Sequence, residues 1–190
     1  MKLESIDFGP EDLQTMLDDL IDTERRSLLA RLGQAAERLH ELASRVEDEP
    51  PSDRQEWTPK EILAHFAMFL GFYVQLVRDV VDGKVSELNL LRKFQGRDVI
   101  GQRLVRRTSA ELAQFAAAAL KELLEWLHSA PPTDFSKGCQ VDSGLPETRF
   151  VSVSDLVRLP LCAHMELHLD QLEHALRRSH ERSVAPGSHA

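Results

Sequence analysis

Three histidines have the side chains and the spacing to bind a metal ion. His164 and His168 are four residues apart in a predicted helix, so they lie on one helical face about 6 Å apart. His65 is the one polar side chain of the apolar segment 62–74, the hydroxyl of Tyr73 aside. Neutral imidazole nitrogens bind zinc and similar divalent ions. Three of them from two helices would leave metal positions open for water or substrate.

Each part of this pattern also has an ordinary explanation. The histidine pair arises easily by chance in a chain with eight histidines, and it then forms a partly exposed polar stripe. A buried imidazole without a partner costs about 1–3 kcal/mol, so His65 could instead bond a backbone carbonyl or a carboxylate. The other histidines are expected at helix ends, on polar faces or in the tail, as ordinary groups: His40, His128, His174, His180 and His189.

Two polar residues near these histidines could support them. Gln171 follows His168 by three residues on the same helical face, so it could bond a ligand histidine or a substrate. A solvent-facing amide is the alternative for Gln171. Glu61 lies one turn before His65, but the pattern Thr58-Pro59-Lys60-Glu61 is a capping box, which explains Glu61 sufficiently.

The two cysteines are weak candidates for catalysis. Cys162 falls on the side of its helix opposite the histidines, with no base beside it, which favours a small buried apolar residue. Cys139 is expected in a loop, and nothing marks it. The motifs G-x-S-x-G, G-x-G-x-x-G and Walker A do not occur.

The apolar residues recur with a helical period in four segments, which predicts an all-α fold. No run of alternating residues indicates a strand. The first helix begins near Glu11 or Thr23, with residues 11–22 a separate short helix in the second case. The last begins at Ser152 or Ser154 and is kinked by Pro160. The four ranges are about 11 or 23 to 44, 58–81, 108–128, and 152 or 154 to 178. The long links 82–107 and 129–151 leave an up-down and a crossover four-helix bundle open.

Composition indicates one acidic globular domain over residues 1–190, with an extension at 1–22 and a flexible tail at 179–190. The net charge of −8 argues against nucleic acid as a partner. The longest uncharged stretch, 62–77, is shorter than a membrane span of about 18 residues, and no signal peptide is visible. We therefore expect a cytoplasmic protein without a membrane partner. The basic segment 92–107 could steer an anionic substrate, although a solvated loop is the simpler interpretation.

The run from Trp57 to His65 (WTPKEILAH), followed about 100 residues later by His164-x-x-x-His168-x-x-Gln171, resembles the DinB-like superfamily. The match extends from about residue 20 to 178. The resemblance implies a four-helix bundle with a crossover connection. It does not explain residues 1–22, which we expect to form a short N-terminal helical extension. It also implies that His65, His164 and His168 bind one divalent ion, with nickel or zinc as the expected metals.

Characterised members of that superfamily include thiol S-transferases and isomerases. The resemblance therefore implies a metal-dependent transferase that acts on a low-molecular-weight thiol and an electrophile. Two alternatives stay open: a non-catalytic metal-binding or stress-response protein, and a hydrolase that uses the same metal site. The sequence is compatible with a homodimer and does not identify the thiol.

Overall fold

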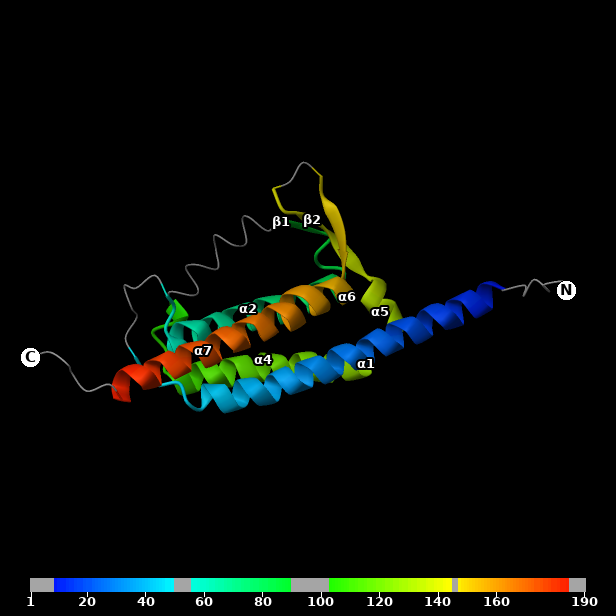
Figure 1. Cartoon of the computed structure of the whole chain (residues 1–190). Coiled ribbons are helices and arrows are strands. Elements are labelled where there is room, and N and C mark those ends of the chain that lie inside the picture. Colours follow the sequence, from blue (N-terminus) through cyan, green and yellow to red (C-terminus); the bar gives the residue numbers. More distant parts are fainter. Residues whose placement is uncertain (1–8, 50–55, 90–102, 145–146, 185–190) are drawn as a thin grey trace, which may run out of the picture.

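The computed structural model describes residues 9–49, 56–89, 103–144 and 147–184, and it is mostly helical. Four long helices run beside one another (Figure 1): α1 (Pro10–Ala43), α2 (Pro59–Val81), α4 (Ser109–Ser129) and α7 (His164–Val184). Both α4 and α7 pack against α2, and the same two helices pack against α1. This contact pattern places α1 and α2 diagonally across the core.

The shorter elements lie at one end of the long helices, where a small sheet stands (Figure 1). They are α5 (Pro132–Ser136), α6 (Val153–Leu156), the π-helix η1 (Val157–Ala163), β1 (Glu87–Asn89), β2 (Gly138–Asp142) and β3 (Arg149–Ser152). The central strand β2 is parallel to β1 and antiparallel to β3. The sheet corrects the expectation of an all-α chain. Its strands have three to five residues, too few for an alternating pattern to stand out.

The starts of α2 and α4 confirm the two capping boxes read from the sequence. The Thr58 hydroxyl accepts a hydrogen bond from the Glu61 N–H, and the Glu61 carboxylate accepts one from the Thr58 N–H at 2.7 Å. Thr108 and Glu111 form the same reciprocal pair at α4. Each box satisfies two backbone donors that the helix itself leaves unpaired.

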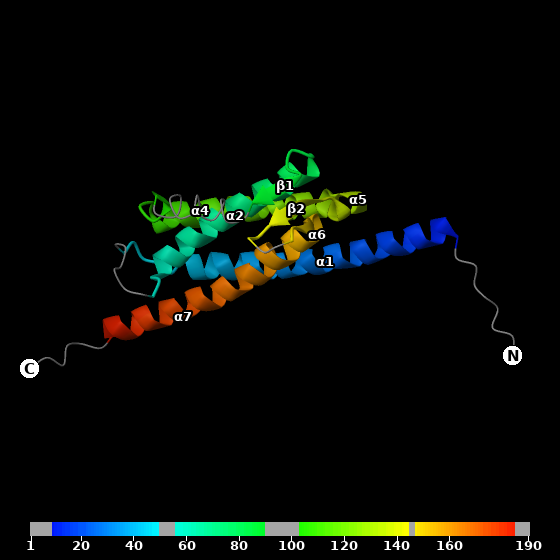
Figure 2. The same cartoon turned by 90° about the horizontal axis from the view of Figure 1, so that it is seen from above.

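Helix α1 is continuous, so residues 11–22 do not form a separate helix. Gly33 interrupts nothing, and a Cβ atom at that position would meet no other atom within 4 Å. The first half of α1 extends past the ends of the other long helices (Figure 2). A stripe of large apolar side chains on this half is about half exposed: Leu13, Met16, Leu17 and Leu20.

The last helical run differs in two ways from its prediction. Ser152 caps α6 as expected, but the chain then forms the π-helix η1 around Pro160, where the sequence predicted a kink. Proline has no N–H, and the wider π turn accommodates the missing backbone bond. The run also continues to Val184, beyond the predicted end at about Arg178.

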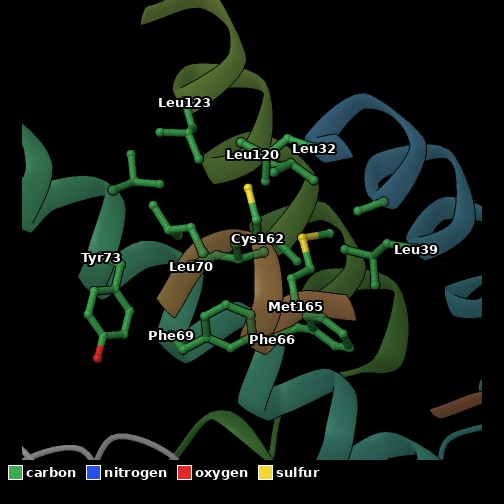
Figure 3. Close-up of a cluster of buried hydrophobic side chains, with 14 of the residues drawn as sticks. Leu32, Leu39, Phe66, Phe69, Leu70, Tyr73, Leu120, Leu123, Cys162 and Met165 are labelled. Carbon is green, nitrogen blue, oxygen red and sulfur yellow. The ribbon is translucent and has the colours of Figure 1, made fainter. Parts of the chain in front are cut away.

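The core between the long helices is apolar, and Figure 3 shows part of it. Phe66 and Phe69 of α2 belong to this cluster together with Leu120 of α4 and Met165 of α7, and all four side chains are buried. By length and composition α2 could cross a membrane, but 61% of its most apolar window is buried within the structure. Buried core helices pass the same test, so this is weak evidence for a membrane span.

Candidate metal centre

Three imidazoles that the sequence singled out converge between α2 and α7. The Nε2 atom of His164 lies 3.4 Å from Nε2 of His65 and 2.6 Å from Nε2 of His168. One ligand atom from each ring lies within 4.8 Å of the corresponding atoms of the other two. All three side chains are partly buried. They form a group that could hold one metal ion.

Local structure sets the position of each ring. The capping box at Thr58 fixes where α2 begins, and His65 then lies on the second turn of that helix. His164 is the first residue of α7, directly after η1, and its N–H bonds the Leu159 carbonyl five residues back. His168 follows one helical turn later, on the same face as His164.

The donor set fits a small divalent ion. Metal–nitrogen bonds of about 2.0–2.1 Å in a tetrahedral site place two nitrogens about 3.3 Å apart. The separation of 3.4 Å between His65 and His164 matches that spacing. The separation of 2.6 Å between His164 and His168 is about 0.7 Å shorter, so these two rings must move apart slightly to admit an ion.

Gln171 bonds the outer nitrogen of His168. Its Oε1 atom lies 2.7 Å from Nδ1, and an amide oxygen can only accept, so Nδ1 carries the proton. The lone pair of His168 is therefore on Nε2, which faces the other two histidines. Burial lowers the pKa of His168, and the bond from Gln171 opposes this only in part. The lowered pKa keeps the His168 ring neutral, and the proton on Nδ1 leaves Nε2 free to bind a metal ion.

Aromatic rings enclose the three histidines. The indole of Trp57 lies nearly parallel to the ring of His168, with 6.1 Å between the centroids and an angle of 17°. The centroid of the Phe69 ring lies 4.8 Å from that of His164 and 5.4 Å from that of His65. These apolar neighbours limit access of water to the three rings.

A pocket opens beside the histidines, on the side of Trp57 and His168. Its volume is about 380 Å³, and its lining residues are Glu56, Trp57, His168, Gln171, His174 and Arg178. The guanidinium of Arg178 lies 3.2 Å from the carboxylate of Glu56, and both residues line this pocket. A ligand that reaches the histidines from here would pass both charges.

The pocket adds residues that the sequence analysis missed as site residues. Trp57 was read only as part of a motif, and Arg178 and Glu56 were not noticed. His174 was expected on a polar face, and it is exposed in the pocket, six residues after His168. The spacing of Gln171, His174 and Arg178 on one face of α7 was the available signal.

Glu61 and Cys162 have the structural roles that the sequence predicted, whereas Cys139 does not lie in a loop. Glu61 caps α2, and Cys162 points into the core beside Leu120 (Figure 3). Burial raises the pKa of the Cys162 thiol to about 12, which rules out a thiolate at neutral pH. Cys139 is buried in β2, so the expectation of a loop there is wrong. Most of the basic segment 92–107 lies outside the described residues.

Comparison with known proteins adds no assignment. No family model, no curated protein and no solved structure matches the chain. The resemblance to the DinB-like superfamily therefore stays a prediction, and the histidine cluster carries the functional argument.

Proposed function

We propose that this chain is a metal-dependent transferase of the DinB-like type, with a crossover four-helix bundle built from α1, α2, α4 and α7. His65, His164 and His168 would hold a divalent ion, nickel or zinc, and the substrates would be a low-molecular-weight thiol and an electrophile. The observation that carries the proposal is the convergence of three imidazole nitrogens from two helices.

The number of protein ligands supports an enzyme over a closed structural site. Structural zinc sites have four protein ligands, whereas catalytic sites have three and keep one position for substrate or water. Among the described residues, the metal-binding cluster contains these three histidines and no fourth His, Cys, Asp or Glu. The pocket at Trp57 borders the cluster at His168, and we propose that a small molecule approaches the site from there.

The side chains around the site would each have a separate task. When bound, a divalent ion lowers the pKa of a thiol beside it from about 8.5, so that more of the nucleophilic thiolate is present at neutral pH. Gln171 would hold His168 in the tautomer whose Nε2 is free to bind. Trp57 would cover His168 and exclude water from one side of the site.

The protein's own thiols have no part in this scheme. Cys162 is buried in the core with a pKa of about 12, and burial raises the pKa of Cys139 as well. A thiol from solution would lose its proton to water. Its sulfur would then form a bond to carbon of the electrophile while the leaving group departs with the electron pair of the broken bond.

The test begins with metal content and ends with turnover. The purified protein, loaded with zinc or with nickel, is mixed with 2-sulfanylethanol or glutathione and with 1-chloro-2,4-dinitrobenzene. Conjugation replaces chloride by sulfur and is followed by absorbance. We expect a rate above that of the thiol alone, and its loss in the His65→Ala/His164→Ala double variant together with the metal.

A matched control is His128→Ala, because His128 is exposed on α4 and lies outside the cluster. This variant should keep both metal and rate. Full metal content without turnover of any thiol would instead favour a non-catalytic metal-binding protein. Full metal content in the double variant would refute the metal site itself.

A further inference from the structure

The pocket that His168 lines also contains a cation, the guanidinium of Arg178. Four side chains of α7 line it at steps of three or four residues: His168, Gln171, His174 and Arg178. We propose that Arg178 binds the carboxylate of the thiol substrate, so that the preferred thiol is an elongated anionic one. This inference rests on the proposed function, since it assigns the second end of a molecule whose sulfur lies at the histidines.

The geometry separates the two ends by a distance that a small molecule can span. His168 and Arg178 are ten residues apart, which is about 15 Å along a helix axis. Side chains on a helix point back toward its N-terminus, so the guanidinium of Arg178 lies closer to His168 than its Cα does. Its partner Glu56 is the residue before Trp57, whose ring stacks on His168. The His168 ring points in the same direction, so much of this separation remains, and a chain of about six carbons is the length to test.

Glu56 indicates the chemistry that Arg178 accepts. Its carboxylate lies 3.2 Å from the Arg178 guanidinium and occupies the place proposed for the carboxylate of the ligand. The guanidinium group presents several donors in a planar fork that matches a carboxylate or a phosphate. An anionic ligand would therefore compete with Glu56 for the same donors.

The competition favours a ligand that is anchored at its other end. The Glu56 side chain is 66% exposed, and ion pairs between exposed side chains contribute little to stability. Arg178 is more enclosed, with 31% of its side chain exposed. A ligand already held by its sulfur presents its carboxylate at a high effective concentration, which an exposed glutamate does not match.

This competition makes opposite predictions for the two members of one ion pair. Arg178→Gln removes the binding partner, so affinity for an anionic thiol falls. Glu56→Gln removes the competitor, so that affinity rises. A merely structural role for the pair would weaken binding in both variants. Arg177→Gln is the matched control, because Arg177 is exposed, pairs with Glu173 and does not line the pocket.

The probe is binding to the cobalt-loaded protein, followed by the absorption band of sulfur bound to cobalt. Two thiols of equal length are titrated, 6-sulfanylhexanoate and 6-sulfanylhexan-1-ol, and the ratio of their dissociation constants is measured. We expect the wild type to prefer the acid by about tenfold, as charge-assisted hydrogen bonds allow. The preference should disappear in Arg178→Gln, increase in Glu56→Gln and stay unchanged in Arg177→Gln.

Length provides a second check that needs no variant. 4-Sulfanylbutanoate is two carbons shorter and should not reach Arg178, so it should bind no better than 4-sulfanylbutan-1-ol. Equal binding of the two six-carbon thiols to the wild type would overturn the role of Arg178 and leave the proposed function intact. If cobalt binds but neither thiol gives the band, the proposed function fails and this inference fails with it. If Arg178→Gln does not fold, the rise expected for Glu56→Gln decides the matter.

Discussion

The side-chain oxygen of Gln171 lies 2.7 Å from Nδ1 of His168, on the ring edge opposite the nitrogen that faces His164. One amide thereby selects the tautomer of one histidine. Residues that orient metal-binding histidines in this way are typically worth a factor of 10–100 in metal affinity. Gln171 is thus a positioning residue of the proposed centre.

Loss of this bond should weaken metal binding without loss of the fold. We expect Gln171→Ala to raise the dissociation constant for zinc by about 10- to 100-fold, measured by competition with a chromophoric chelator. Gln171→Glu keeps the acceptor and should restore the affinity. The control is Gln75→Ala, because Gln75 is exposed on α2 and bonds Asp79. Equal affinities of wild type and Gln171→Ala would contradict the role of Gln171.

Metal occupancy should depend on pH in a defined direction. Protons compete with the metal for imidazole nitrogen, so zinc should dissociate as the pH falls below about 6.5. Burial lowers the pKa of His168, which keeps its nitrogen free of a proton to lower pH than in an exposed histidine. Zinc content after dialysis at stepped pH, with circular dichroism to confirm folding, measures this. Release above pH 7 would be inconsistent with these ligands.

Cys162 should be chemically inert in the folded protein. With a pKa of about 12, roughly one thiol in ten thousand is ionised at pH 8, and the side chain is buried as well. Iodoacetamide should label Cys162 in urea and leave it unlabelled in buffer, as read by peptide mass spectrometry. Cys162→Ala should keep the metal and the rate. Rapid labelling of the folded protein would show that the core opens at this point.

Substitution by alanine should change the free energy of unfolding in opposite directions at two glycines. A Cβ atom on Gly138 would collide with the Val151 carbonyl oxygen and the ring of Phe150, across the β2–β3 pair. We expect Gly138→Ala to lower the free energy of unfolding by about 1–3 kcal/mol. Gly33→Ala, with open space around it in α1, should raise that free energy by up to about 1 kcal/mol. Urea denaturation of both variants measures the difference.

Local signals in the sequence predicted the helices well. Thr58 and Glu61, or Thr108 and Glu111, are three residues apart, so a capping box depends on nothing distant. The convergence of His65 with His164 is a long-range event, but it was predictable because His65 is a polar residue in an apolar helix and needs a partner. The metal-binding role remains a prediction from that convergence.

Several of the missed features depend on contacts between segments that are distant in the sequence. The strand pairing of Cys139 with Val151 brings together short segments of ordinary composition. The ion pair of Glu56 and Arg178 joins residues more than a hundred positions apart, and neither is unusual for a surface. Pro160 indicated an irregular helix, but its type depends on how the flanking segments are held.

The π-helix η1 ahead of His164 contains one residue more per turn than an α-helix would need. Its wider hydrogen bonding, from the His164 N–H to the Leu159 carbonyl, would tighten to ordinary α-helical bonding if one residue were removed. Deletion of the exposed Leu159 should therefore leave Ser152 in the sheet and His164 at the metal centre. Deletion of the equally exposed Leu167 would turn His168 by about 100° around the axis and separate the ligands. The chain thus tolerates a change of length on one side of His164 and forbids it on the other.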